Sequence, residues 1–315
     1  MNRHLAFDGF TASHSKLNIS AFNVAATYIF SKRGVEPRSR AGVWDELSTG
    51  RPHQCVEILK QSERDFVARI NGAEHIILLT DIGDITRIFL SSIVYVDMTG
   101  LGHNLWSALL RAMLSRAEVV EGYFIYSEPD VYQSHQSPSS NNLFDLSAAF
   151  GGIAPLPGMA NLTEVERGIR TVLVPFLGFE TARAQFIANT LDPIPKVIPV
   201  VGLPGFRIDY PQVTVASNDS FLDDTRSYSS IRYARASCPF EAYSVLADIS
   251  RDNPGSFIYI APIGTKPHSL GAVWFAIDHP QETEVIYDHP VRKNNRSTGI
   301  GQTHIYKIKP RDVDL

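Results

Sequence analysis

Residues Ser256–Ile277 have the sequence SFIYIAPIGTKPHSLGAVWFAI. The unbroken apolar run over 257–261 predicts a buried strand, and the Pro-Ile-Gly-Thr that follows predicts a turn. A helix is expected over 269–277, because Pro267 suits a helix start, where its missing N–H would have had no partner. Lys266 then lies beside the partly positive N-terminus of that helix, an arrangement that favours an anion. A tight turn with a solvated lysine is the alternative, and the spacing of a P-loop is absent.

Similar apolar runs recur along the chain. Buried strands are expected near residues 76, 93, 123, 172, 197, 257 and 284. Helical spacing over 56–70, 105–116, 181–189 and 240–249 predicts helices between or before them. Because the apolar runs are continuous and not alternating, both faces of the sheet should be covered. The sequence therefore predicts an α/β fold that is Rossmann-like, with a mostly parallel sheet and helices on both faces.

The composition is that of a globular protein. The chain has 315 residues, 44% of them hydrophobic and 20% charged, enough for a large core. We expect a loop-rich N-terminal region over 1–75, suited to contact with a partner, and a Rossmann-like domain over 76–315. The net charge of −4 gives no overall attraction to nucleic acid or to anionic membranes. No apolar stretch is long enough to predict a membrane span, and no signal peptide is expected.

The cysteine content favours a reducing compartment. Cys55 and Cys238 are the two cysteines, too few for a disulfide framework or a zinc site. We expect both to be reduced and buried, and the protein to be cytoplasmic.

Polar residues follow several of the predicted strands. In a parallel sheet the carboxyl ends of the strands meet at one edge, where ligands bind. We therefore expect Lys266 to face the turn over 97–104 in a shared pocket. The candidate ligand-binding residues are Asp97, Thr99, Gly100, His103, Asn104, Glu180, Arg183, Gly264, Thr265, Lys266, His268 and Arg292. Solvated loops and core side chains are the alternative interpretation for each of them.

Established catalytic motifs are missing from the sequence. The histidines form no H-x-x-x-H pair, no G-x-S-x-G elbow is present, and no G-x-G-x-x-G follows the first strand. We accordingly predict neither a metal site nor a cofactor. If the protein is an enzyme, the candidate acid–base residues are Asp97, Glu180, His103, His268 and His289.

The element FIYIAPIGTKPHSLGAV, residues 257–273, resembles the signature of the CARF domains, the CRISPR-associated Rossmann-like ligand sensors. Those domains carry a strand, a turn of the form N-x-T-G-G-T-K and a helix. Gly264, Thr265 and Lys266 match that turn, whereas the preceding Ala-Pro-Ile departs from it. The resemblance implies a cyclic oligonucleotide bound at the strand ends and a role in bacterial antiviral defence. The blocks VDMTG, PFLGFE, IGTKPHSLG and YDHPVRKNNRSTGIG resemble motifs of a bacterial protein family and imply no activity.

Three functions follow as hypotheses. The first is a sensor or accessory subunit that binds a nucleotide-type ligand or nucleic acid. The second is an enzyme, a hydrolase, that acts on a nucleotide or nucleic acid with the acid–base residues named above. The third is a structural subunit of a protein complex, which docks through residues 1–50 or the loop over 130–165. A protein partner or a second copy of the chain is expected with the first and third.

Overall fold

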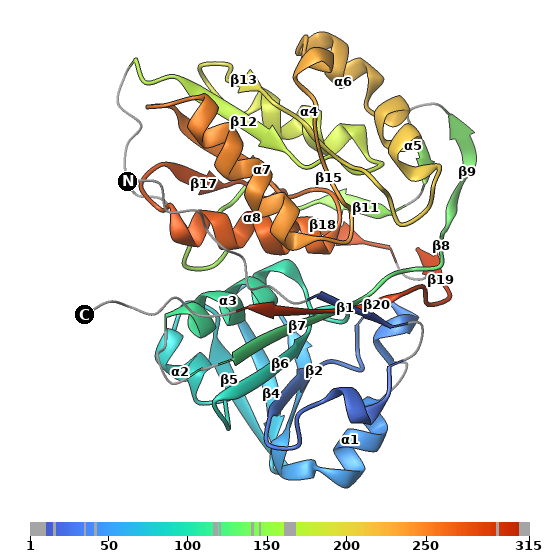
Figure 1. The fold of residues 1–315 in the computed structure, drawn as a ribbon, viewed down its shortest axis with the longest axis vertical. Coiled ribbons are helices and arrows are strands. Elements are labelled where there is room, and N and C mark those ends of the chain that lie inside the picture. The colour runs from blue at the N-terminus through green and yellow to red at the C-terminus, as the bar shows by residue number, and fades with distance from the viewer. Residues whose placement is uncertain are drawn as a thin grey trace. The chain divides into compact units, whose positions relative to one another are not determined.

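The computed structural model describes residues 11–14, 17–34, 36–40, 43–115, 119, 121–139, 142–144, 146–160, 168–293 and 296–308 (Figure 1). The chain divides into two compact units. The first unit consists of Met1–Asp130 together with Thr298–Leu315, and the second of Val131–Ser297. The predicted division after residue 75 differs from this one, because residues 76–130 belong with the N-terminal segment.

The first unit contains an eight-stranded sheet with the order β1-β20-β7-β6-β2-β3-β4-β5. Its strands are β1 (Thr11–His14), β2 (Thr27–Phe30), β3 (Cys55–Gln61), β4 (Asp65–Ile70), β5 (Ala73–Leu78), β6 (Ile93–Asp97), β7 (Glu121–Ser127) and β20 (Thr303–Ile308). Its helices are α1 (Trp44–Gly50), α2 (Ile82–Thr86) and α3 (His103–Leu114), with the 3-10 helices η1 (Ile19–Ala21), η2 (Pro37–Arg40) and η3 (Pro52–Gln54).

The prediction of one mostly parallel, Rossmann-like sheet is wrong. The pairs β7–β6, β6–β2 and β2–β3 are parallel, but β1–β20, β20–β7, β3–β4 and β4–β5 are antiparallel. The large sheet is therefore mixed, with antiparallel strands at both edges, and further strands form separate sheets. Buried apolar runs do occur in β6 and β7, but such runs reveal burial and not the direction of the neighbouring strand.

The predicted helix over 56–70 is also wrong, because this segment is the β3–β4 hairpin. The pairing register shifts between Ile58 and Lys60, which marks a β-bulge. The bulge leaves both Ile58 and Leu59 buried. Apolar residues at positions 56, 58 and 59 therefore lack the strict alternation of a strand and imitate helical spacing.

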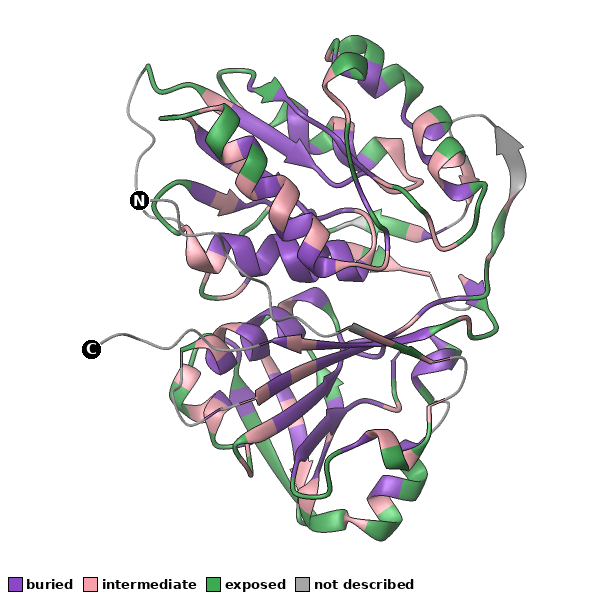
Figure 2. Cartoon of the chain, in the orientation of Figure 1, coloured by how far each residue is buried: buried purple, intermediate pink, exposed green. Residues whose placement is uncertain are grey.

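Both faces of the large sheet are covered. On one face Phe30 of β2 stacks against Trp44 of α1, with ring centroids 4.9 Å apart, within a core that also contains Leu47. On the other face a Cβ at Gly122 of β7 would come within 1.9 Å of the sulfur of Met113 in α3. Figure 2 shows the buried residues concentrated on the central strands of this sheet and on α3. Glycine at position 122 thus allows α3 to pack closely.

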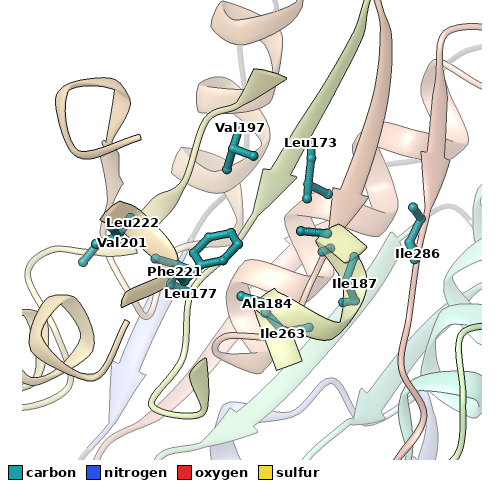
Figure 3. Close-up of a cluster of buried hydrophobic side chains, with 12 residues drawn as sticks. Leu173, Leu177, Ala184, Ile187, Val197, Val201, Phe221, Leu222, Ile263 and Ile286 are labelled. Atoms are coloured by element: carbon teal, nitrogen blue, oxygen red, sulfur yellow. The ribbon is translucent and has the colours of Figure 1, made fainter. Parts of the chain in front are cut away.

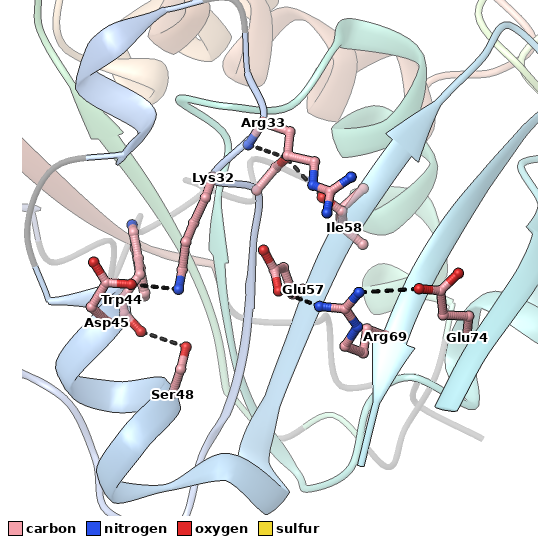
Figure 4. A network of polar contacts seen from close by, with 10 residues as sticks. Lys32, Arg33, Trp44, Asp45, Ser48, Glu57, Ile58, Arg69 and Glu74 are labelled. Atoms are coloured by element: carbon pink, nitrogen blue, oxygen red, sulfur yellow. Dashed lines mark hydrogen bonds and ion pairs between the residues drawn. The ribbon is translucent and has the colours of Figure 1, made fainter. Parts of the chain in front are cut away.

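Ion pairs tie the outer elements of this unit to the sheet (Figure 4). Lys32, just after β2, lies 2.5 Å from Asp45 of α1. Arg69 of β4 lies between Glu57 of β3, at 3.4 Å, and Glu74 of β5, at 3.1 Å. These pairs are partly exposed, so each contributes only about 1 kcal/mol or less to stability.

The second unit contains a four-stranded parallel sheet with the order β13-β12-β16-β17. Its strands are β12 (Thr171–Pro175), β13 (Lys196–Val197), β16 (Phe257–Ala261) and β17 (Thr283–Val285). The α-helices are α4 (Thr181–Asn189), α5 (Tyr210–Ser217), α6 (Asp219–Asp224), α7 (Pro239–Asp252) and α8 (Lys266–Asp278), and η4 (Tyr228–Ser230) is a 3-10 helix. The predicted helix over 181–189 is confirmed, and the helix expected over 269–277 begins three residues earlier.

The described residues also form four two-stranded sheets: β9 (Ser134–Ser139) with β10 (Asn142–Phe144), β11 (Ser147–Phe150) with β18 (Pro290–Arg292), β14 (Val200–Gly202) with β15 (Arg232–Ala234), and β8 (Val131–Tyr132) with β19 (Ser297–Thr298). The core of the second unit lies between the parallel sheet and the helices α4 and α6 (Figure 3). Leu173 of β12, Ile187 of α4 and Phe221 of α6 are each fully buried there.

Within the described ranges, no helix has the length and apolar character needed to cross a membrane.

Candidate functional site

The predicted site residues lie on two different sheets. Those from Asp97 to Asn104 follow β6 of the large sheet in the first unit. Those from Glu180 to Arg292 belong to the second unit, where β12 and β16 form part of the parallel sheet. The expectation that Lys266 faces the 97–104 turn depended on one shared sheet, and that premise does not hold.

Asp97, at the end of β6, accepts hydrogen bonds from a side chain and from the backbone of the following turn. It is 3% exposed, and its Oδ2 accepts a hydrogen bond from Trp44 Nε1 at 2.9 Å. Its Oδ1 accepts a hydrogen bond from the backbone N–H of Thr99, also at 2.9 Å. Thr99 Oγ1 in turn accepts one from the N–H of Ser127 at 2.9 Å. Both carboxylate oxygens therefore serve the β6 turn and its neighbours, as buried polar groups must.

Gly100 allows two chain segments to touch. A Cβ on it would lie 2.5 Å from the carbonyl oxygen of Ser31, and a Cβ on Gly34 would lie 2.8 Å from Gly100 Cα. Gln61 fastens the same loop, accepting from the N–H of Gly102 at 2.7 Å and donating to the carbonyl of Gly100 at 3.1 Å. The space between the ends of β2 and β6 is thus filled by the protein's own backbone.

His103 and Asn104 open α3. His103 is buried, and its ring centroid lies 5.1 Å from that of Trp106 in the same helix. Asn104 Oδ1 is also buried and accepts no hydrogen bond from any described residue. These two residues therefore face the interior of the first unit, and His103 packs as a core side chain.

In the second unit, Arg183 is the centre of a buried ion network. Its Nε and Nη2 donate to the two carboxylate oxygens of Asp288 at 2.7 and 2.6 Å, and its Nη1 donates to the carbonyl of Ile263 at 3.1 Å. Glu180 Oε2 lies 3.8 Å from Nη1 and accepts a hydrogen bond from Ser147 Oγ at 3.0 Å. Burial alone would lower the pKa of Arg183, but the hydrogen bonds and charge of Asp288 raise it overall. The guanidinium stays charged and bidentate.

The Glu180–Arg183 spacing is compatible with an ion pair within one helical turn, but nothing in the sequence indicates the dominant Arg183–Asp288 pair. Residues 180 and 183 are one helical turn apart, so their spacing is visible in the sequence. Asp288 is 105 positions from Arg183, and only the strand order brings them together. Arg292, also a candidate, lies in β18 opposite Ser147 and is half-buried.

The N-terminus of α8 is capped by the side chain of Thr265. Thr265 Oγ1 accepts a hydrogen bond from the N–H of His268 at 3.3 Å and donates one to the carbonyl of Ala236 at 2.7 Å. His268 is 1% exposed and contacts the carbonyl of Arg235 through Nε2 at 3.0 Å. Burial lowers the pKa of His268 to about 4, although these backbone contacts raise it in part. The ring is therefore neutral near pH 7 and contributes no positive charge to an anion.

Lys266 is buried, and Gly264 lies against the backbone of a neighbouring loop. Lys266 is only 6% exposed, so the alternative of a solvated lysine in a tight turn does not hold. A Cβ on Gly264 would lie 3.0 Å from the carbonyl oxygens of both Phe176 and Leu177. The close approach that glycine allows here is between two loops of the protein.

The second unit contains an aromatic cluster that no sequence pattern predicts. Tyr132, Phe144, Phe179 and Tyr210, here called the aromatic quartet, contact one another in every pairing, with ring centroids 4.6–6.0 Å apart. The guanidinium of Arg207 lies 5.8 Å from the Tyr210 ring. Three of the rings are half-buried and Tyr210 is buried. Four separate segments supply the rings, so no local spacing indicates the cluster.

The aromatic quartet lies next to the carboxyl end of β12, because Phe179 follows that strand by four residues. Following the chain, β13 is added on one side of β12, whereas β16 and then β17 are added on its other side. At such a switch point the connections that follow the two neighbouring strands leave the sheet on opposite faces, and a ligand can bind between them. Burial raises the pKa of Tyr210, an effect that the backbone of Tyr132 partly offsets, so its hydroxyl remains protonated near pH 7.

No protein-family model matches the sequence, and no curated protein matches it. Among the residues described, no group of three or more His, Cys, Asp or Glu side chains is placed to hold a metal ion.

Proposed function

We propose that the protein binds a nucleotide-type ligand at the aromatic quartet of its second unit. The observation that supports this most is the position of Phe179, which belongs to the quartet and lies in the loop between β12 and α4. Aromatic faces stack on nucleobases, and each stacked base contributes about 1–3 kcal/mol. Arg207, above the Tyr210 ring, supplies a positive charge for phosphate.

A binding role accounts for the polar residues better than the hydrolase of our second hypothesis. Asp97 has both oxygens engaged within the first unit, and the buried His268 is neutral with its Nε2 on a backbone carbonyl. Glu180 is held by Ser147 and Arg183. A general acid or base needs a free position within reach of the substrate. Asp97 and Glu180 are held by their hydrogen bonds, and His268 is only 1% exposed.

The resemblance of residues 257–273 to CARF domains supplies the finer part of the proposal. It names a cyclic oligonucleotide as the ligand and antiviral defence as the setting, and both rest on that resemblance alone. A sensor would pass its signal to a partner protein or to a second copy of the chain. A cytosolic location suits the two cysteines, Cys55 and Cys238, which are unpaired.

Calorimetric titration of the full chain tests this proposal. The ligands are mononucleotides, dinucleotides and cyclic oligonucleotides, and we expect at least one of them to release heat and saturate. Phe179→Leu keeps an apolar side chain but removes the aromatic face, and should raise Kd about tenfold. Phe186→Leu is the matched control, since Phe186 is 37% exposed on α4 and outside the quartet. No heat with any ligand, or equal Kd values in both variants, would refute the proposal.

A further inference from the structure

A hydroxyl, an imidazole and a carboxylate form a chain of hydrogen bonds in the first unit. Ser13 Oγ lies 2.7 Å from His304 Nδ1, and His304 Nε2 lies 2.6 Å from Glu128 Oε1. Ser13 lies in β1 and His304 directly opposite it in β20, so the two side chains share a face of the sheet. Glu128 follows β7, the next strand. The three residues are far apart in sequence, and none of them is a candidate of the sequence analysis.

The order of these groups is fixed by their hydrogen bonds. An ionised carboxylate can only accept, so the hydrogen at His304 Nε2 points to Glu128. In this tautomer Nδ1 carries the lone pair, and the hydroxyl of Ser13 donates to it. The proton of Ser13 thus already points to a base, and the base is oriented by a third group. This is the arrangement by which proteins activate a serine.

Burial and backbone contacts hold the imidazole and the carboxylate in place. His304 is 3% and Glu128 8% exposed, whereas Ser13 is exposed at the edge of the sheet. The N–H of Glu128 donates to the carbonyl of Gln302 at 2.8 Å, and the N–H of Gly301 donates to the carbonyl of Glu128 at 2.9 Å. The reactive hydroxyl therefore faces solvent while its supporting groups are shielded, as a nucleophile that must meet a substrate requires.

We propose that Ser13 is a nucleophile that cleaves carboxylic esters, with His304 as its base and Glu128 as a positioning residue. Ser13 Oγ bonds to the carbonyl carbon of the ester while its proton passes to His304 Nδ1. The bond from that carbon to the alkoxy oxygen then breaks, and the alcohol leaves with the proton from His304. A water molecule next attacks the acyl-serine, gives its proton to His304 and releases the acid. Ser13 finally regains the proton.

This activity is separate from ligand binding in the second unit, and a reagent that needs no known substrate tests it. A fluorophosphonate forms a bond between its phosphorus and an activated serine oxygen; fluoride leaves, and the serine proton passes to the base. We expect one label per folded chain, mapped to Ser13 by mass spectrometry. The label should react at least about 100-fold faster than with unfolded protein, in line with general base catalysis.

Variants of Ser13 and Glu128 assign the reaction to this chain of hydrogen bonds. Ser13→Ala should abolish labelling, whereas Ser20→Ala, at another exposed serine of the same unit, should leave it unchanged. Glu128→Gln should slow labelling, and Glu128→Asp should recover part of the rate because it restores the carboxylate. Because Ser13 is exposed on an edge strand, Ser13→Ala should keep the wild-type unfolding midpoint. Labelling no faster than in the unfolded chain, or labelling that persists in Ser13→Ala, would overturn the proposal.

Discussion

Among single residues, Arg183 shows most clearly how this protein uses buried charge. It joins α4 to Asp288, after β17, and to the loop that contains Ile263. Asp288 is fully buried, so its charge is stabilised only if the guanidinium stays in place. The two residues therefore fix the loops beside β12 and β16 before any ligand arrives.

Removal of Arg183 should be strongly destabilising. Arg183→Met leaves the buried carboxylate of Asp288 without its partner, and we expect the free energy of unfolding to fall by about 3–5 kcal/mol. Urea denaturation followed by circular dichroism measures this. In the control Arg207→Met, the lost pair with Asp209 is half-exposed, and the change should stay below about 1 kcal/mol. A loss below 1 kcal/mol for Arg183→Met would show that the buried pair is not structural.

His268 should make stability depend on pH. Its folded-state pKa of about 4 lies below the ordinary value of 6.5. Between these two values the unfolded chain binds a proton that the folded chain does not, so acidification favours unfolding. The free energy of unfolding should therefore fall by about 3 kcal/mol from pH 6.5 to pH 4 through this residue.

Denaturation of wild type and His268→Gln at several pH values checks that prediction. The variant should be less stable at pH 7 but should lose less stability on acidification. His53→Gln, a substitution of an exposed histidine, should keep the wild-type pH dependence. Parallel pH curves for wild type and His268→Gln would contradict the assignment.

At the scale of elements, the packing of α7 against α8 depends on one glycine. A Cβ at Gly271 of α8 would lie 2.0 Å from the carbonyl oxygen of Pro239 and 3.0 Å from Ala242 Cβ, both in α7. No real Cβ tolerates the shorter distance, so the helices would have to separate. Glycine here allows two buried helices to approach closely, and its low helix propensity is outweighed.

Gly271→Ala should therefore destabilise the protein, although alanine favours a helix by about 1 kcal/mol. We expect a net loss of about 1–3 kcal/mol from overpacking, measured by thermal or urea unfolding. Gly50→Ala is the control, because a Cβ at the end of α1 would meet no atom within 4 Å. If Gly271→Ala were as stable as Gly50→Ala, the close contact of α7 and α8 would be refuted.

The elements also show what the sequence could predict. Apolar runs located β6, β12 and β16, and Pro267 indicated the start of α8, because these signals are local. The β3–β4 hairpin was mistaken for a helix because its bulge disturbs the alternation. The direction of the edge strands, the Arg183–Asp288 pair and the aromatic quartet depend on segments far apart in the chain. Local spacing carries no information about such contacts.

At the scale of the whole molecule, the chain crosses from the first unit to the second and returns. Residues 298–315 contribute β20, which lies between β1 and β7 of the large sheet. The second unit is instead one continuous segment, Val131–Ser297. Each of the two units has its own hydrophobic core cluster.

These connections predict different behaviour for two fragments. The fragment 131–297 contains its whole unit and should unfold in one cooperative transition. The fragment 1–130 lacks β20, leaves β7 without an antiparallel neighbour and should not fold cooperatively by itself. Urea denaturation of both fragments, followed by circular dichroism, gives the answer. Cooperative unfolding of 1–130 at the stability of the full chain would contradict the role assigned to β20.

Hydrogen–deuterium exchange of the full chain tests the proposed function most directly. It is measured with and without the nucleotide that gives the largest calorimetric heat. We expect slower exchange in the segments 176–180 and 207–210, around the aromatic quartet, and unchanged exchange in the turn over 97–102. Slower exchange at 97–102 without any change at 176–180 would contradict it, and so would identical exchange with and without nucleotide.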